Sequence, residues 1–259
     1  MPPIQHRLPL TPLEVPGLLV FWDFQEAGGE ARVSRGPQRY ALCEQNGPVE
    51  RVEVPGAPWG PFAAKLNEGQ WFNLPRAQCP ALDIHGPEGH LTVIAWLQRA
   101  RCAKVHCEFV AGQWNESHLG RQYGMFLNLG LWGSRDQLCA HVSNVGGPTP
   151  GYKYCMDAAI GATAIPYETW VCVAMTYDGV CARAYLNGEL DAREGLNPYP
   201  YAGGLHGGKS EGSDFTVGAV HRSGEMGNWF AGLLGGLAVY RRALSLAELR
   251  ALAAPNAVG

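Results

Sequence analysis

Short apolar runs separated by turn residues fill most of the chain. The runs are rich in Val, Ile, Leu, Phe, Tyr and Trp, and Gly, Pro, Asn and Asp stand between them, a pattern typical of β-strands joined by turns. Helical periodicity is nearly absent, which favours an antiparallel sandwich or jelly roll over a parallel α/β sheet. The expected strands span residues 18–24, 62–66, 70–74, 91–97, 105–111, 122–131, 137–145, 170–177, 181–187, 215–220 and 229–241.

One short helix is expected near the C-terminal end of the sequence. Ser245 and Glu248 have the spacing of a capping box, and Leu249, Leu252 and neighbouring alanines follow. The chain has no internal repeat and no change of composition along its length. We therefore expect a single domain over residues 1–259, with its core in residues 17–252.

The pair Asp178-Gly179 predicts a tight turn between two of these strands. In the strand register that such a two-residue turn produces, Cys181 pairs with Thr176, and Cys172 lies four residues further along its own strand. The two cysteines are then too far apart for a disulfide, whose Cα atoms lie within about 7 Å. The 8 cysteines include no C-x-x-C pair of the kind found in zinc sites. We expect reduced thiols and a reducing compartment.

Composition and charge narrow the classes of partner. The 259 residues are 46% hydrophobic and 17% charged, which is enough to bury a core. A net charge of −3, from 20 Lys and Arg against 23 Asp and Glu, argues against a nucleic-acid partner. No stretch reaches the roughly 18–20 apolar residues that span a bilayer, and the first residues lack a secretory signal pattern. We therefore expect no membrane partner and a cytoplasmic location, unless the sequence is cut from a longer protein.

Four segments carry recognisable motifs. Residues 18–24 read LLVFWDF, residues 91–97 read LTVIAWL, residues 169–179 read TWVCVAMTYDG with AYLNG at 184–188, and residues 232–245 read GLLGGLAVYRRALS, followed by Glu248. In this order the segments resemble the laminin-G-like (LamG) jelly rolls of the concanavalin A-like lectin/glucanase superfamily. The resemblance runs from about Leu18 to Leu252. It implies an all-β fold: a concanavalin A-like antiparallel β-sandwich or jelly roll with a short C-terminal helix, whose concave face often holds carbohydrate.

Two positions depart from that family. Cys172 stands where the family often has histidine, so any role of that histidine is absent. Gly235-Gly236 replaces an acidic residue that, in many relatives, helps to hold a calcium ion. The resemblance implies that calcium could be a cofactor, and the loss of the acidic residue at Gly235-Gly236 weakens that expectation. The sequence does not identify residues that would bind the metal.

Two short motifs match catalytic patterns in the wrong context. Residues 189–194 fit the E-x-D-x-x-E pattern of laminarinase-type glucanases, but they follow the AYLNG segment, where the family has an ordinary strand. Residues 203–210 fit a phosphate-loop pattern, yet neither the preceding strand nor the following helix of that motif is expected. We interpret both matches as coincidences.

Strand parity separates core positions from a second face. In residues 137–145, Leu138, Ala140 and Val142 share one face, which is expected to be core, while His141 lies on the other. By the same alternation, Gln122 and Asn128 lie on the second face of their strand. These polar groups could line a groove, or they could belong to a plain solvated sheet face.

Loops expected near the rim add further candidates. Trp114 and Glu116 lie in the stretch 113–118, where a sugar ring could stack on the indole, although Trp114 could instead be a framework residue. The insertion 147–154 contributes Tyr152 and Lys153. The full set of candidate ligand-binding residues is Trp114, Glu116, Arg121, Gln122, Asn128, His206, His221 and Arg222.

Three functions remain open on the sequence. The first is a lectin-like domain that binds a glycan or oligosaccharide, and an anionic sugar would suit a cluster of His, Lys, Arg and Tyr. The second is an intracellular carbohydrate-active enzyme, either a glycoside hydrolase or a polysaccharide lyase with His141, Tyr152 and Lys153 as catalytic residues. The third is a protein-interaction scaffold.

Overall fold

The computed structural model describes residues 10–27, 30–102, 106–117, 119–222 and 224–253. The ends of the expected domain, the start of the strand expected at residues 105–111, and residue 118 of the rim loop lie outside the described residues. Within them, the strands form two large antiparallel sheets, and the described part of the chain ends in one short helix. The expected fold class is confirmed: the protein is a concanavalin A-like β-sandwich.

One layer is a sheet of nine strands within the described residues. Strands β1 (Leu18–Trp22) and β5 (Phe62–Leu66) both pair with β19 (Gly232–Tyr240), at opposite ends of that strand. Strand β15 (Tyr199–Pro200) pairs with β13 (Cys181–Leu186). In spatial order the main path is β14 (Glu189–Leu190), β13 (Cys181–Leu186), β12 (Trp170–Tyr177), β7 (Leu91–Arg99), β19 (Gly232–Tyr240), β5 (Phe62–Leu66) and β4 (Glu50–Glu53), to which β1 (Leu18–Trp22) and β15 (Tyr199–Pro200) are added.

The other layer is a sheet of eight described strands. Its order is β11 (Ala158–Ala164), β10 (Gln137–Val142), β9 (Tyr123–Leu127), β8 (Glu108–Gln113), β16 (Phe215–Val217), β6 (Trp71–Leu74), β3 (Ala41–Gln45) and β2 (Arg32–Val33). A separate hairpin joins β17 (Val220–Arg222) and β18 (Glu225–Gly227). Short 3₁₀ turns are η1 (Pro12–Glu14), η2 (Arg76–Gln78), η3 (Pro80–Leu82), η4 (Leu131–Gly133) and η5 (Lys209–Glu211).

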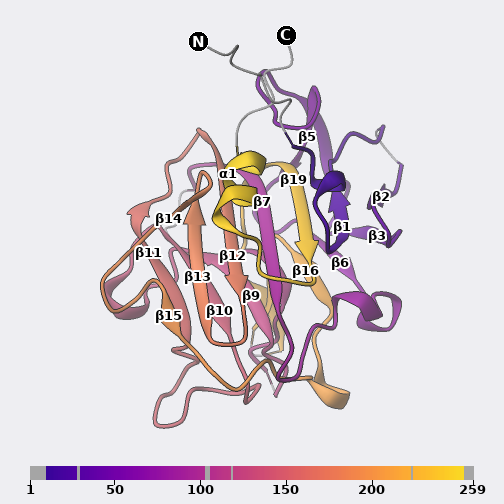
Figure 1. Ribbon diagram of the computed structural model, residues 1–259. Helices are drawn as coiled ribbons and strands as arrows, with labels where there is room; N and C mark the ends of the chain where they lie inside the picture. Colours follow the sequence, from indigo (N-terminus) through magenta and orange to yellow (C-terminus); the bar gives the residue numbers. More distant parts are fainter. Residues whose placement is uncertain (1–9, 28–29, 103–105, 118, 223, 254–259) are drawn as a thin grey trace, which may run out of the picture.

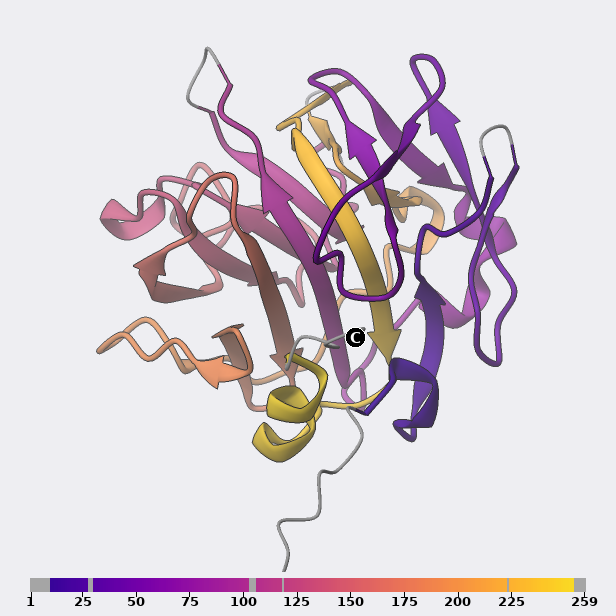
Figure 2. The ribbon, with the colours of Figure 1, turned by 90° about the horizontal axis from the view of Figure 1, so that it is seen from above.

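The main core lies between the two layers. In Figure 1, β9, β10 and β16 lie behind β12, β7 and β19, and Figure 2 shows the layers from above. Leu138, Ala140 and Val142 are buried in this core, as strand parity predicts, together with Val173 and Met175 of the facing sheet. The opposite faces of these strands therefore point away from the core, to either side of the sandwich.

Helix α1 (Leu246–Ala253) covers part of the outer face of the nine-stranded sheet (Figure 1). Its capping box is present, because the Ser245 backbone N–H donates to the Glu248 carboxylate at 2.8 Å and the Glu248 backbone N–H donates to the Ser245 hydroxyl oxygen at 3.3 Å. Leu249 and Leu252 pack on Trp96, whose indole N–H donates to the Leu252 carbonyl at 3.1 Å. No helix in the described part of the chain is long and apolar enough to cross a bilayer.

The hairpin between β12 and β13 forms, but its expected register is wrong. Thr176 pairs with Arg183, and Cys181 lies beyond the paired positions. The reason is the side chain of Asp178, whose Oδ1 accepts hydrogen bonds from the backbone N–H groups of Val180 and Cys181. This aspartate turn widens the loop by comparison with a two-residue turn on Asp-Gly. All eight cysteines are free thiols.

The pair Gly235-Gly236 in β19 lets a tryptophan-bearing loop pack against the outer face of the sheet. A Cβ at Gly235 would lie 2.6 Å from Pro58, and one at Gly236 would lie 2.6 Å from the Trp59 ring. Trp59 stands edge-on to Trp96, with ring centroids 4.8 Å apart. The space that an acidic side chain would need is therefore filled by indole and proline rings.

Candidate functional site

A cavity of about 530 Å³ opens on the outer face of the eight-stranded sheet. Its floor is formed by Trp114, by Phe126 on β9 and by His141 on β10, the positions that parity sends away from the core. We call it the Trp114 cavity. The loop from β8, the turn η4, the segment around Cys155 and the β17 hairpin form its walls.

The imidazole of His141 belongs to the aromatic floor. Its ring centroid lies 4.9 Å from that of Trp114 and 5.3 Å from that of Phe126. Burial, together with the nearby charge of Arg121, lowers the pKa of His141 to about 3, so the ring is neutral near pH 7. Its Nδ1 atom is buried and has no hydrogen-bond partner among the described residues.

Two exposed aromatic side chains stand at the rim. Trp132 on η4 is 46% exposed and Tyr154 is 56% exposed, whereas Trp114 is almost fully buried. Trp132 has a left-handed backbone (φ 49°, ψ 36°), which costs about 1–3 kcal/mol for a bulky residue. Its indole N–H donates to the Met156 carbonyl at 3.4 Å. Strain held at an exposed tryptophan beside a cavity is typical of a binding position.

The charged groups of the cavity are Arg121, Arg222 and Glu116. Arg222 lies 3.9 Å from a carboxylate oxygen of Glu116 and also donates to the Asn228 amide oxygen. The Arg121 guanidinium donates to the backbone carbonyl of Glu116 at 2.9 Å. Burial raises the pKa of Glu116 and lowers that of Arg121, because water is largely excluded from both groups.

Five of the residues proposed from the sequence line this one cavity: Trp114, Glu116, Arg121, His141 and Arg222. They come from β10 and from loops after β8, before β9 and in the β17 hairpin. The structure thus brings together side chains as much as 108 positions apart, the separation of Trp114 and Arg222. Their roles in binding stay a prediction.

Four other proposed ligand residues lie elsewhere and make structural contacts. The Gln122 side-chain amide accepts a hydrogen bond from Arg76 and donates one to Asp83. The Asn128 side-chain amide donates to the His106 carbonyl and accepts from the Asp136 backbone N–H. The backbone N–H of His206 donates to the Ser143 carbonyl. His221 stands edge-on to Trp71, and its carbonyl accepts the backbone N–H of Glu116.

Of the three residues proposed for a lyase, His141 lies on the floor of the cavity, whereas Tyr152 and Lys153 lie beside its rim. Tyr152 is half exposed and stands edge-on to Trp132, with centroids 6.0 Å apart. The Lys153 ammonium lies 5.2 Å from the centre of the Tyr154 ring. Neither Tyr152 nor Lys153 lines the Trp114 cavity, although both lie beside aromatic residues that do.

The sequence analysis missed Trp132 and Tyr154. For Trp132 a signal was available, because Gly130-Leu-Trp-Gly133 places an aromatic residue in a turn too short to bury it. For Tyr154 the insertion was noticed, but nothing in its sequence distinguishes Tyr152 from Tyr154.

Neither of the two motifs interpreted as coincidences contributes a residue to the described lining of this cavity. The Glu189 carboxylate pairs with Arg250 of helix α1 at 2.6 and 2.8 Å, and that of Asp191 accepts from Thr163. The glycine-rich stretch 203–210 is a loop that ends in the 3₁₀ turn η5, and the Arg76 guanidinium donates to its Gly207 carbonyl.

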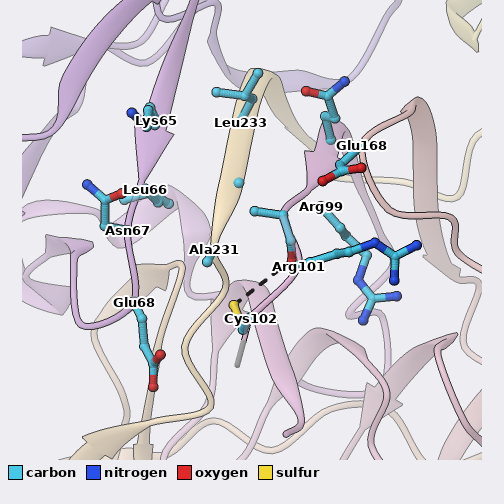
Figure 3. Close-up of a pocket in the computed structure, with 13 residues that line it drawn as sticks. Lys65, Leu66, Asn67, Glu68, Arg99, Arg101, Cys102, Glu168, Ala231 and Leu233 are labelled. Carbon is cyan, nitrogen blue, oxygen red and sulfur yellow. Dashed lines mark hydrogen bonds between the residues drawn. The ribbon is translucent and has the colours of Figure 1, made fainter. Parts of the chain in front are cut away.

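Two other cavities lie elsewhere on the described part of the protein. One, of about 390 Å³, lies between the ends of β5, β7 and β19, with Lys65 on one side and Arg99 and Arg101 on the other (Figure 3). Another, of about 600 Å³, lies beside helix α1 and is lined by Trp96, Trp170 and the Glu189–Arg250 pair. Size alone does not distinguish these cavities. The Trp114 cavity is the candidate site because exposed Trp132 and Tyr154 stand at its rim and because buried Arg121 in its lining has no described carboxylate partner.

The Trp114 cavity contains few groups that could act as an acid or a base. Glu116 is the single carboxylate among its described lining residues, whereas most glycoside hydrolases use two. His141, with a pKa of about 3, is a weak base near pH 7. In the described residues no group of three His, Cys, Asp or Glu side chains is placed to hold a metal ion.

Two antiparallel sheets, with an aromatic and charged cavity on the outer face of one of them, define a lectin-like jelly roll. A laminin G family model, described as the concanavalin A-like lectin/glucanases superfamily, matches residues 68–250. The chain belongs to this family. The resemblance seen in the sequence motifs is thereby confirmed.

Solved structures with the same fold include domains of carbohydrate-active proteins. Domain 4 of an extracellular GH43 arabinanase from Geobacillus stearothermophilus, in complex with arabinotriose, has a TM-score of 0.62 and 16% identity, covering 91% of this chain and 98% of its own. A Trypanosoma rangeli sialidase in complex with the inhibitor DANA has a TM-score of 0.59 and 17% identity, covering 93% of this chain but 33% of its own. The chain therefore spans about a third of the sialidase. Among curated proteins no relative matches the chain.

Proposed function

We propose that this protein binds an oligosaccharide in the Trp114 cavity, without cleaving it, and that the bound sugar is anionic. The observation that carries the proposal is the combination of exposed Trp132 and Tyr154 at the rim with the charged groups of Glu116, Arg121 and Arg222 in the lining. Sugars bind by stacking an apolar ring face on an aromatic side chain while polar groups take their hydroxyls.

Size and charge of the cavity support the same ligand. A volume of about 530 Å³ falls in the range of small-molecule sites and suits more than one sugar unit. Arg121 and Arg222 outnumber Glu116, so the lining carries a net positive charge that favours an acidic sugar. The arabinanase domain with a similar fold is bound to arabinotriose, which supports an oligosaccharide ligand for this chain as well. The cytoplasmic location expected from the sequence stays a prediction.

Isothermal titration calorimetry with neutral and uronate-containing oligosaccharides tests the proposal. We expect saturable binding, and an affinity about threefold to tenfold lower for Trp132→Ala because one stacking surface is lost. Trp170→Ala is the matched control, since that tryptophan lies on the outer face of the other sheet. Absence of binding to every glycan at millimolar concentration would contradict the proposal.

The same mixtures are followed for new reducing ends and for the ultraviolet absorbance of unsaturated products. We expect neither to change over hours. Unsaturated products would show a lyase and direct mutagenesis to His141, Tyr152 and Lys153. New reducing ends alone would show a hydrolase.

A further inference from the structure

Arg121 is a buried arginine without a carboxylate partner. Its side chain and backbone together are 6% exposed, and no described carboxylate oxygen lies within 4.0 Å of its guanidinium. The other two buried arginines of the described chain are both paired: Arg32 with Glu26 and Glu44, and Arg99 with Glu108 and Asp136. Among the buried arginines of the described residues, Arg121 is therefore the exception that has no carboxylate partner.

The hydrogen bonds of Arg121 are also incomplete. A guanidinium has five N–H donors, and the single recorded side-chain bond runs from Nη2 to the Glu116 carbonyl at 2.9 Å. Its other nitrogens are absent from the set of buried atoms without partners, so they are accessible from the cavity that Arg121 lines. A buried charge with open donors is costly unless an anion or water completes it.

The surroundings of Arg121 do not supply that anion. Glu116, the nearest acidic side chain of the cavity, lies 3.9 Å from Arg222 and offers Arg121 its carbonyl oxygen rather than its carboxylate. His141 is neutral, and its unpartnered Nδ1 lies in the same floor. One positive charge thus remains uncompensated in the lining.

We propose that the sugar bound in the Trp114 cavity carries a carboxylate, and that Arg121 is the residue that binds it. This inference rests on the proposed function of the cavity. A single unpaired guanidinium matches the two coplanar oxygens of a carboxylate through two parallel N–H···O bonds. A sulfate ester has three terminal oxygens, so one guanidinium would leave part of that group without donors. The ligand class is therefore a uronate or a similar carboxylate-bearing sugar.

The first test changes the ligand and leaves the protein intact. The probes are uronate-containing trisaccharides and the same trisaccharides with the carboxyl reduced to a primary alcohol, each titrated calorimetrically. We expect the reduced sugars to bind about 10- to 100-fold more weakly, because the charged hydrogen bonds to Arg121 are lost. Equal binding of both forms, or tighter binding of sulfated neutral trisaccharides, would overturn the carboxylate assignment while leaving oligosaccharide binding in place.

The second test assigns the effect to Arg121. Arg121→Gln is expected to abolish the preference for the uronate form, and Arg121→Lys to retain part of it, since lysine keeps the charge but not the planar fork. Arg250→Gln on helix α1 makes the same change of net charge on the opposite face and is expected to keep the full preference. A preference that survives in Arg121→Gln would overturn the role of Arg121. If no sugar binds the wild-type protein, the proposed function itself fails.

Discussion

Arg99 and Arg121 are both buried, yet their surroundings differ completely. Arg99 is fully buried and donates to Glu108 at 2.5 and 3.2 Å, to Asp136, to the Ile165 carbonyl and to the Tyr167 hydroxyl. Burial lowers the pKa of Arg99, but the bonds to the carboxylates raise it further, so the net shift is upward.

The pKa of Arg121 is lowered instead, because burial outweighs the attraction of the nearby Glu116 carboxylate, which makes no direct bond to the guanidinium. A satisfied buried cation is part of the framework, whereas an unsatisfied one beside a cavity marks a place for a ligand. The difference teaches that partners, and not burial, separate structural from functional arginines in this sandwich.

The largest expected effect is the loss of stability in Arg99→Gln. Removing this cation leaves Glu108 buried without its partner, which costs about 3–5 kcal/mol of unfolding free energy. Chemical denaturation of the wild type and the variant measures it. The same substitution at Arg121 should change stability by less than about 1 kcal/mol, because no ion pair is broken. Equal losses at both positions would contradict the comparison.

The second expected effect is the pH dependence of the unfolding free energy that His141, the neutral neighbour of Arg121, produces. The pKa of His141 is lowered from 6.5 to about 3 in the folded protein, chiefly by burial. Between these values the unfolded chain binds the proton and the folded chain does not, so stability is full above pH 6.5 and falls as pH falls. We expect a contribution of up to about 1.4 kcal/mol per pH unit over that window.

Comparing His141→Phe with the wild type isolates this contribution, since the other acidic groups titrate in both proteins. The difference in unfolding free energy should shift steadily between pH 6.5 and 4 in favour of the variant. Parallel curves for the two proteins would mean that the pKa of His141 is the same in the folded and unfolded states, and the floor beside Arg121 would then gain a positive charge below pH 6.5.

The smallest expected effect separates strain from contact at Trp132. Alanine keeps the left-handed backbone strain of that position, whereas glycine removes it. We expect Trp132→Gly to be more stable than Trp132→Ala by about 1 kcal/mol in thermal unfolding, while both bind sugar more weakly than the wild type. Equal stability of the two variants would show that the turn is unstrained and would remove one reason to place ligand at Trp132.

The sequence predicts the fold better than the site, for a physical reason. Alternation along β10 correctly sends Leu138 and Val142 into the core, because side chains of a strand alternate strictly between two faces. Strand β11, with the sequence AAIGATA, was missed because alanine and glycine give no strand signal without the sheet beside them.

The site depends on contacts that alternation does not describe. Gln122 has the parity of a groove residue, yet Arg76 and Asp83 from a distant turn hold its amide. Arg121 looks like any charged residue in a loop, and its lack of a partner is visible only when Glu116 and Arg222 are brought beside it. Such pairings are tertiary, so no local pattern contains them.

Strand β19 has a consequence for how the protein is made. It is the last strand in chain order among the described residues, yet it lies between β7 and the strands β1 and β5, with Leu18 paired to Tyr240. Pairings between strands that are this far apart in the sequence form slowly, and the edges of the sheet stay unpaired until they form. A nascent chain that stops before residue 232 leaves one edge of β7 and one edge of β5 unpaired, so we expect the sheet to close only once this last strand has been synthesised.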